Sequence, residues 1–440
     1  MSSCELLFYS PRVTPRLSYI SRLFFEELLG LKLQIVEDQE FFKQSTHPHK
    51  LSYCAKAVGE ELNLCPQGLL VERGLNEQTI HVKEWNGLPI FFLVRNAEVP
   101  FDPLAASFFL VTRYEEYLPH KRDIYNRFDV HQSVAYRHGF LDKPLVNLWA
   151  YCLRDLLKAR YPALQFKKRK YRFVPTIDVD NAYAYLEKGF VRTSGAYLRS
   201  IFRGDFQDLR ERSRVLIGAD ADPYDTFDLQ LELQKQYDLK PIYFFLVADY
   251  GVNDKNVPIT SRRFQSLIKG MNDYAAVGIH PSFGSNSEPE KLKEEIKRLS
   301  NVLHAEVTKS RQHFLKLHLP ETYRQLIHRE ITDDYSMGYA AEMGFRASIC
   351  DSFLFFDLDR EVETSLRIHP FCIMEATLRF YKKVAPEKAL AHFQPIVDAV
   401  KAVDGTLMAL WHNDSLSEHH QWVGWRELYE ETIKLALPSS

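Results

Sequence analysis

The chain has 440 residues, 45% of them apolar and 26% charged, and its formal net charge at pH 7 is −2. This length predicts two domains, and the balance of acids and bases gives no bulk electrostatic case for binding nucleic acid. No apolar run approaches the roughly 20 residues that span a bilayer, and the N-terminus lacks the pattern of a signal peptide. We therefore expect a cytoplasmic protein without a membrane span.

The sequence pattern over residues 1–165 predicts a small N-terminal α/β domain. The sequence does not reveal the role of this domain. Thr14-Pro15 is typical of a helix start, Gly30 of its end, and Asp102-Pro103 of a second helix start. The basic run 167–170 interrupts the apolar pattern and marks a domain boundary. The six cysteines contain no CxxC pair, which argues against a disulfide framework and against a cysteine-type zinc site.

Residues 170–438 alternate strand and helix signals. This alternation predicts a parallel sheet with crossover helices. Seven strands predict a distorted (β/α)7 barrel, whose functional residues gather at the carboxyl ends of the strands. Helical periodicity is clearest over 288–304. The strand-like runs lie near 172–178, 241–248, 275–280, 311–317, 344–350, 366–374 and 406–412.

The first of these strands ends in two acids, Asp178 and Asp180. Side chains two residues apart on a strand point the same way. Two carboxylates that face one another in a core are costly unless a metal, a cation or a shared proton compensates them. The alternative interpretation is that the strand ends at Val179 and the acids are solvated loop residues.

Three later strand-like runs carry side chains that bind metals or move protons. His280 ends one apolar run, His412 closes the last, and Arg311 and His313 share one face of a run between them. A lone histidine is more often structural than functional. The carboxyl ends of parallel strands meet at one edge of a sheet, however, so we expect these side chains to face the two carboxylates.

Carboxylate and imidazole together form a ligand set that suits zinc or a similar divalent ion. A metal with an open position polarises a carbonyl and lowers the pKa of bound water, while nearby carboxylate and imidazole groups transfer protons. The sequence contains no nucleotide-binding glycine motif and no motif of a covalent nucleophile. The pattern therefore favours hydrolysis of an amide or an ester.

On these residues, the C-terminal part, residues 170–438, resembles the polysaccharide deacetylase (NodB-homology) family. The resemblance implies a divalent metal, expected to be zinc, and an acid–base pair that removes N- or O-acetyl groups from a carbohydrate. The segment Thr176-Ile-Asp178-Val-Asp180 is similar to the family's first motif, which would make Asp178 the general base and Asp180 a metal ligand.

The second family motif carries two histidines, and only the first is present here, as His280. Gly284 stands where the second is expected, so the third metal ligand would come from elsewhere, with His313 and Asn286 as candidates. Arg311 is similar to the arginine that steadies the base. The run that ends at His412 is similar to the last motif, which carries the catalytic histidine.

Segments around 334–340 and 240–245 resemble a bacterial branch of this family, in which an N-terminal α/β domain precedes the barrel. Arg346, in the same branch-like region, is a further catalytic candidate that either pairs with a catalytic acid or neutralises a structural one. Glu375 is either a site acid or a surface residue. Residues 188–214 hold an excess of lysine and arginine, which predicts a solvated helical face on an insertion or, alternatively, a cap over the site that grips an anionic glycan or a partner subunit.

Three alternatives to metal-dependent deacetylation stay open. The absent second histidine favours metal-independent opening of a cyclic amide on the same barrel. A glycosidase would use Asp178 with an acid such as Glu375. An inactive glycan-binding or assembly protein would need neither metal nor base. A carbohydrate is the expected ligand in most of these cases, and the sequence is compatible with a homo-oligomer.

Overall fold

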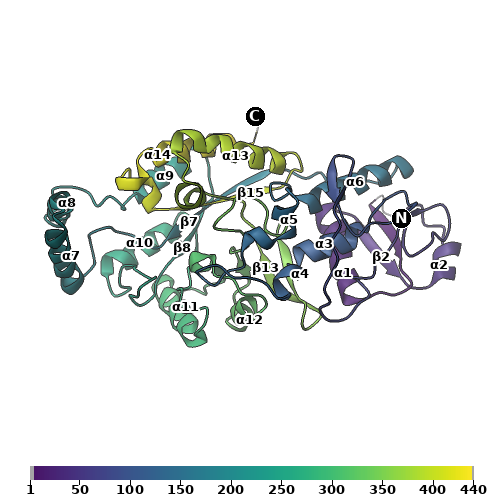
Figure 1. The fold of residues 1–440 in the computed structure, drawn as a ribbon, viewed down its shortest axis with the longest axis horizontal. Coiled ribbons are helices and arrows are strands. Elements are labelled where there is room, and N and C mark those ends of the chain that lie inside the picture. The colour runs from purple at the N-terminus through teal and green to yellow at the C-terminus, as the bar shows by residue number, and fades with distance from the viewer. Residues whose placement is uncertain (1–3, 439–440) are drawn as a thin grey trace.

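The structure is a computed structural model that describes residues 4–438, and it shows a mixed α/β protein with two parallel sheets. The molecule is elongated (Figure 1), with the N-terminal residues near one end and a pair of helices, α7 (Phe190–Arg203) and α8 (Phe206–Leu216), at the other. Among residues 4–438 no helix combines the length and the apolar character that a membrane span requires.

The N-terminal part is built on a four-stranded parallel sheet in the order β2-β1-β3-β4. Its strands are β1 (Glu5–Tyr9), β2 (Lys32–Val36), β3 (Lys50–Tyr53) and β4 (Leu62–Leu64), and a separate hairpin pairs β5 (Lys83–Trp85) with β6 (Leu88–Ile90). The helices are α1 (Pro15–Ser21), η1 (Arg22–Leu28), α2 (Gln39–Gln44), α3 (Pro103–Val111), α4 (Tyr114–Tyr117), η2 (Val130–Gln132), α5 (Val134–Arg137) and α6 (Leu145–Arg160). Thr14 and Asp102 cap α1 and α3 with their side chains, as the sequence predicts.

The C-terminal part is built on a nine-stranded sheet in the order β12-β13-β11-β10-β9-β8-β7-β15-β14, parallel except between β12 and β13. Its strands are β7 (Arg172–Val179), β8 (Ile242–Phe245), β9 (Ala276–Ile279), β10 (Lys309–Ser310), β11 (Asp333–Asp334), β12 (Phe353–Asp357), β13 (Val362–Ile368), β14 (Ile373–Met374) and β15 (Thr406–His412). Its other helices are α9 (Phe227–Gln236), α10 (Arg262–Asn272), α11 (Pro289–Leu303), η3 (His313–Leu315), α12 (Glu321–His328), η4 (Thr377–Lys382), α13 (Pro386–Lys401), η5 (Asp414–Leu416), η6 (His420–Trp422) and α14 (Trp425–Ala436). The predicted alternation and the parallel sheet are confirmed.

This sheet curves strongly without closing into a hydrogen-bonded barrel. Strands β13 and β14 are seven strand spacings apart in the order, which is about 34 Å in a flat sheet. Only residues 369–372 connect them, and such a segment spans at most about 18 Å. The two edges must therefore approach each other, and the curved sheet encloses an inner hydrophobic cluster that includes Phe244, Tyr335 and Leu410.

Two of the seven predicted strands are not strands. Residues 311–317 leave the sheet after β10 and turn into η3, where Phe314 and Leu315 both adopt left-handed backbone conformations. Residues 344–350 are irregular, because their backbone bonds to the N-terminal part instead of to a neighbouring strand: the N–H of Phe345 donates to the carbonyl of Leu141, 2.8 Å away.

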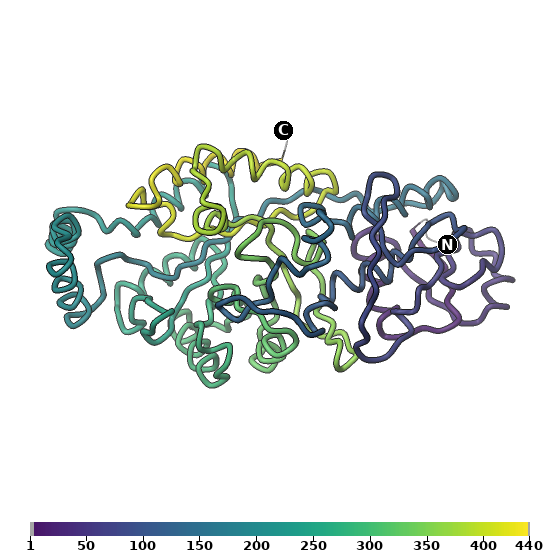
Figure 2. Tube along the Cα trace, viewed as in Figure 1, coloured from purple at the N-terminus to yellow at the C-terminus, as the bar shows by residue number. Residues whose placement is uncertain are grey.

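The N-terminal and C-terminal parts share one hydrophobic core. A single cluster of buried side chains contains residues of both, for example Phe108 of α3 and Phe356 of β12, whose rings pack edge to face at 5.3 Å. Ion pairs reinforce the contact, including one between Arg22 and Glu363. Figure 2 shows segments of the N-terminal part lying beside the C-terminal part. The division into domains at 165/170 stays a prediction.

Candidate active site

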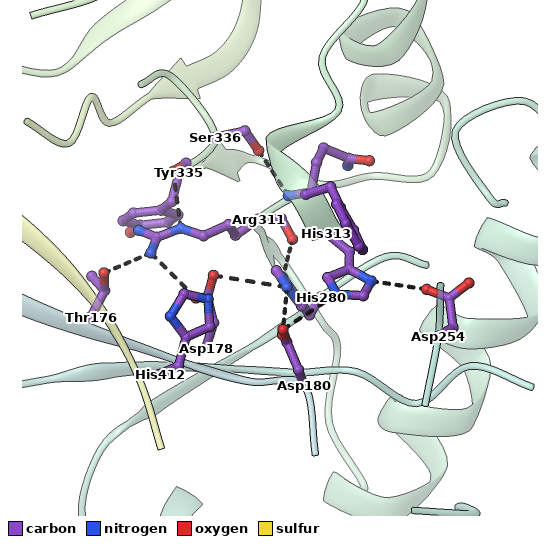
Figure 3. A network of polar contacts seen from close by, with 12 residues as sticks. Thr176, Asp178, Asp180, Asp254, His280, Arg311, His313, Tyr335, Ser336 and His412 are labelled. Carbon is purple, nitrogen blue, oxygen red and sulfur yellow. Dashed lines mark hydrogen bonds and ion pairs between the residues drawn. The ribbon is translucent and has the colours of Figure 1, made fainter. Parts of the chain in front are cut away.

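Alternation along β7 turns two acidic side chains toward the inside of the curved sheet. Val174 packs against the inner cluster, whereas Ile177 and Val179 belong to the outer core. Because strand side chains alternate between faces, Asp178 and Asp180 lie on the side of Val174. Figure 3 shows both carboxylates pointing toward histidine side chains. The strand ends at Val179, as the alternative interpretation predicts, and the Asp180 side chain is 37% exposed, but Asp178 is only 2% exposed and is not a solvated loop residue.

Asp180, His280 and His313 come together beyond the carboxyl ends of β7, β9 and β10. One ligand atom of each lies within 4.8 Å of the other two. Nε2 of His280 is 3.1 Å from Oδ1 of Asp180, and Nε2 of His313 is 3.3 Å from Oδ2 of the same carboxylate. His280 directly follows β9 and His313 begins η3. One oxygen ligand and two nitrogen ligands form a set that binds zinc.

The outer nitrogens of both histidines are fixed by other groups. Nδ1 of His280 is 2.6 Å from the backbone carbonyl of Arg311, and Nδ1 of His313 is 2.9 Å from Oδ1 of Asp254. A carbonyl only accepts, so Nδ1 of His280 carries a proton, and Nε2 is the ring nitrogen that faces Asp180. Oδ1 of Asp180 is buried without a hydrogen-bond partner. Ring nitrogens that face a carboxylate in this way fit a cation between them.

The charges around His313 also favour a cation. Burial alone would lower the pKa of His313, but Asp180 and Asp254 outweigh burial and raise it to about 9. Burial conversely would raise the pKa of Asp180, and the two neighbouring imidazoles instead hold it well below its usual range. Two carboxylates beside one imidazole therefore concentrate negative charge in this pocket. A proton or a metal ion can neutralise that charge.

Asp178 is held by a buried arginine. Nη1 of Arg311 lies 3.3 Å from Oδ1 of Asp178 and donates to Oγ1 of Thr176 at 2.7 Å, while Nε donates to the carbonyl of Tyr335 at 3.0 Å. Arg311 is fully buried, and burial lowers the pKa of its guanidinium although Asp178 opposes this effect. The second carboxylate oxygen of Asp178 lies 3.8 Å from Nε2 of His280. One oxygen is thus fixed, and the other faces the ligand group.

His412 forms a second acid–imidazole pair on the other side of Asp178. Its Nδ1 is 2.8 Å from Oε1 of Glu375, and its backbone N–H donates to the same oxygen at 2.9 Å. Glu375 is fully buried, which decides the open question between a surface residue and a site residue. Burial would lower the pKa of His412, but the charge of Glu375 raises it well above its usual range. The Glu375 carboxylate therefore favours the protonated form of His412.

These groups line a cavity of about 160 Å³ that is open to one side. Its wall includes Asp178, Asp180, His280, His313 and His412. A neighbouring cavity of about 360 Å³ shares four lining residues with it, namely Arg127, Leu315, Ala340 and Tyr381. The polar cluster therefore lies at one end of a longer cleft. This cleft runs between residues 122–131 of the N-terminal part and the curved sheet.

Asn286, the other candidate for the third metal ligand, and the loop position 284 both lie outside the cluster. Asn286 donates from its side chain to the carbonyl of Lys316 at 2.8 Å and to Oγ1 of Thr322 at 3.0 Å, and it belongs to neither the ligand group nor the cavity wall. Gly284 lies in the loop that follows His280, with space where a Cβ atom would point. His313, and not a residue at 284, is the third member of the group that could hold a metal ion.

Arg346 does not lie in the polar cluster, and the prediction that it lies on a strand is wrong. Its Nε and Nη2 donate to the two oxygens of Glu116 at 2.9 and 2.6 Å, and its Nη1 donates to the carbonyl of Gly338. Glu116 also pairs with Arg113, and all three charged side chains are buried. Arg346 thus neutralises a buried acid, one of the two roles that the sequence leaves open, and it also lines the cavity of about 360 Å³, so a catalytic role stays a prediction.

Sequence reasoning missed Asp254 and Arg127. Asp254 lies in the loop that follows β8. Acidic residues in a loop after a strand are a pattern from which it could have been predicted. Arg127 comes from the N-terminal part, where the sequence shows no ligand cluster. It donates to the carbonyl of Phe314 at 2.8 Å and to the hydroxyl of Tyr381 at 3.1 Å. The N-terminal part therefore contributes directly to the cavity wall.

A second group that could hold a metal ion consists of Glu211, His419 and His420. Nε2 of His419 is 2.8 Å from Oε1 of Glu211. This group is more exposed than the first and does not border the cavity that holds Asp178. We therefore place the candidate active site at Asp180, His280 and His313.

Comparison with known proteins gives a family match for the N-terminal part only. Residues 6–162 match DUF7033, a family of unknown function. A search of curated protein sequences finds no match. The family match ends before β7, so it excludes the polar cluster and includes Arg127.

A search of solved structures finds several chains that are similar to part of this one. A protein assigned as a polysaccharide deacetylase from Mycobacterium smegmatis is 13% identical, with a TM-score of 0.39 over 61% of this chain and 86% of its own. The PuuE allantoinase is 13% identical, with a TM-score of 0.36 over 60% and 84%. The carbohydrate esterase pseudoenzyme BA3943 from Bacillus anthracis is 12% identical, with a TM-score of 0.28 over 60% and 62%. These values describe a likeness of fold and say nothing about activity.

Proposed function

We propose that the chain is a metal-dependent hydrolase that removes acetyl groups from a carbohydrate. The observation that carries this proposal is the meeting of one group of three residues and two pairs around one cavity. These are the ligand group of Asp180 and two histidines, the Asp178–Arg311 pair and the His412–Glu375 pair. Such a set provides a metal, a base and an acid, which are what hydrolysis of an amide or ester requires.

The residues that would hold the metal are Asp180, His280 and His313. They fit a divalent ion because the ligand atoms converge and Oδ1 of Asp180 is buried without another partner. Arg311 and Asp254 orient the two imidazoles from outside, as second partners of metal-bound histidines usually do. When bound, a divalent ion supplies Lewis acidity that polarises the substrate carbonyl and acidifies water.

Asp178 is the proposed base. Arg311 and Thr176 fix one side of this carboxylate, and its free oxygen faces the ligand group, where it can accept the proton of the attacking water. His412 is the proposed acid, because Glu375 keeps it protonated, and it delivers a proton to the departing amine or alkoxide. The proton balance closes with acetate and the deacetylated sugar as products.

The two contiguous cavities suggest where the substrate lies. The smaller cavity of about 160 Å³ suits an acetyl group, and the larger one of about 360 Å³ leaves room for a sugar beside Tyr125, Tyr339 and Tyr381. Aromatic rings with a polar edge present both an apolar face and a hydrogen-bonding group to such a ligand.

Zinc content and acetate release from acetylated oligosaccharides, measured on the same protein samples, test the proposal. We expect about one zinc ion per chain in wild type and in Asp178→Asn, with turnover lost by roughly 10²- to 10⁴-fold in the variant. Asp180→Ala/His280→Ala should lose both zinc and turnover. Asp249→Asn, an exposed acid after β8, is the matched control that should keep both.

Each alternative gives a different result. Turnover of a cyclic amide that a chelator does not reduce would favour metal-independent ring opening. Release of reducing sugar without acetate would favour a glycosidase. Glycan binding without turnover at any metal concentration would favour a non-catalytic role. Full acetate release by Asp178→Asn would exclude Asp178 as the base.

A further inference from the structure

The helical hairpin of α7 and α8 exposes an unusual concentration of large apolar side chains. In residues 4–438, 18 large hydrophobic side chains are exposed, and eight of them lie between residues 190 and 217. Phe190, Phe202 and Ile217 are 87%, 87% and 79% exposed. The other five are Val191, Leu198, Ile201, Phe206 and Leu216. Exposed apolar residues scattered singly need no explanation, but a patch of this size marks a docking surface.

The two helices are joined through their polar faces, which leaves the apolar face outside. The hydroxyls of Tyr197 and Ser213 bond at 2.8 Å, and Asp208 accepts from Ser200 at 2.5 Å and pairs with Arg212. This is the reverse of the usual arrangement, in which helices pack through apolar stripes. The predicted solvated helical face is therefore present, but its outer surface carries large apolar side chains.

The hairpin is also fixed to the rest of the protein. Arg192 donates to the carbonyls of Asn256 and Lys255 at 3.0 and 3.1 Å, and Glu211 lies 2.8 Å from His419. None of its residues lines the cavity of the candidate active site, so it is not the cap that the sequence suggested as an alternative. Figure 1 shows it projecting at one end of the long axis.

The hairpin carries positive charge on a protein that is otherwise acidic. Residues 188–217 contain seven lysines and arginines and three acids, a net charge of +4. The whole chain carries −2, so the remaining residues carry −6. On α7, the exposed Arg199 and Arg203 lie one turn apart on one face, about 60 and 100° from the edge of the apolar face, at 100° of rotation per residue.

We propose that this hairpin docks the protein on an anionic lipid surface. Exposed aromatic and aliphatic side chains beside a row of arginines are the features of a helix that lies in the membrane interface without crossing it. Negatively charged headgroups attract the arginines, and the apolar side chains enter the boundary of the acyl chains. Docking of a second copy on this face would oppose two surfaces of charge +4, so charge complementarity favours the lipid.

Sedimentation of the full chain with vesicles tests this proposal. The probes are vesicles of phosphatidylcholine alone and vesicles of phosphatidylcholine and phosphatidylglycerol in equal parts. We expect binding to the mixed vesicles at least about tenfold tighter than to the neutral ones. Phe190→Ser/Phe202→Ser should weaken binding to the mixed vesicles by about tenfold or more, and Arg199→Gln/Arg203→Gln should remove most of the preference for anionic lipid.

Ile124→Ser is the matched control, because Ile124 is 91% exposed but lies far along the chain in the N-terminal part. It should bind vesicles like wild type. Equal binding of wild type and Phe190→Ser/Phe202→Ser, or no preference for the mixed vesicles, would overturn the proposal. A dimer in sedimentation velocity that the phenylalanine variant abolishes, without vesicle binding, would assign the face to a second copy.

Discussion

Arg127 donates from Nη1 to the backbone carbonyl of Phe314 over 2.8 Å, across 187 positions of the sequence. Phe314 and Leu315 directly follow His313, and both have left-handed backbone dihedrals, with φ of 58° and 53°. Such conformations in residues other than glycine cost on the order of 1 to 3 kcal/mol each and persist only where surrounding contacts enforce them. The ring of Tyr125 adds a second contact to Phe314, with centroids 5.0 Å apart.

We therefore expect Arg127→Ala to weaken zinc binding, because it releases the turn that places His313. Loss of an outer contact of a metal ligand typically costs about 10- to 100-fold in metal affinity. Zinc titration against a competing chelator measures this effect. Arg122→Ala is the control, since Arg122 lies in the same loop and bonds within it to Asn126. Unchanged affinity in Arg127→Ala would show that the turn holds without the N-terminal part.

Glu375→Gln should move the basic limb of the pH–activity profile to lower pH. Burial lowers the pKa of His412, and the charge of Glu375 raises it; without that charge the pKa falls. A general acid must be protonated, so activity would disappear at a lower pH than in wild type and return on acidification. Above the lowered pKa the loss approaches the full value of acid catalysis, about 10²- to 10⁴-fold.

The kcat/KM values of wild type and Glu375→Gln over a range of pH check this expectation. His412→Gln serves as the reference, since it should lack activity at every pH and show no recovery on acidification. A basic limb that stays in place in Glu375→Gln would mean that His412 does not donate the proton.

The part of the site that could be predicted is the part that local sequence determines. Asp178 and Asp180 follow from the alternation at the end of one strand, His412 is the last residue of a second, and His280 directly follows a third. His313 and Arg311 were expected on a strand that does not exist, because β10 ends at Ser310. Their positions depend on a turn that residues far away in the sequence stabilise.

The rest depends on contacts between distant parts of the chain. Nothing near Arg127 or Glu116 in the sequence indicates that the first reaches the cavity or that the second accepts from Arg346. The run 344–350 has the apolar pattern of a strand, but its apolar residues are buried in the core that both parts share, and its backbone bonds to Leu141 and Val146 of the N-terminal part. Periodicity reports that a side chain is buried, and it does not report what it is buried against.

Arg346→Met should destabilise the fold without removing the metal site. Arg346 and Glu116 are 2.6 Å apart and buried, so removal of the cation leaves a buried carboxylate with only Arg113 as its partner. Breaking a buried pair typically costs about 3 to 5 kcal/mol. Urea unfolding measures the loss, and Arg360→Met, an exposed arginine, should change the free energy of unfolding by no more than about 0.5 kcal/mol. Normal stability with lost acetate release would restore a catalytic role for Arg346.

Glu295→Gln tests a carboxylate that positions the loop after His280. Glu295 is buried in α11 and accepts from the backbone N–H of Ser282 at 3.0 Å. Burial raises its pKa from 4.5 to about 6. Between these values the folded state binds more protons than the unfolded state, so the free energy of unfolding falls as pH rises through this window and stays lower above it.

A neutral glutamine keeps the acceptor and removes this dependence. The variant should gain stability relative to wild type as pH rises from 4.5 to 6, by up to about 2 kcal/mol, since one pKa unit corresponds to about 1.4 kcal/mol. Chemical denaturation at several pH values measures the difference, and Glu294→Gln, an exposed neighbour on the same helix, provides the control. A stability difference between Glu295→Gln and wild type that does not vary with pH would show that Glu295 is charged at no cost in the folded state.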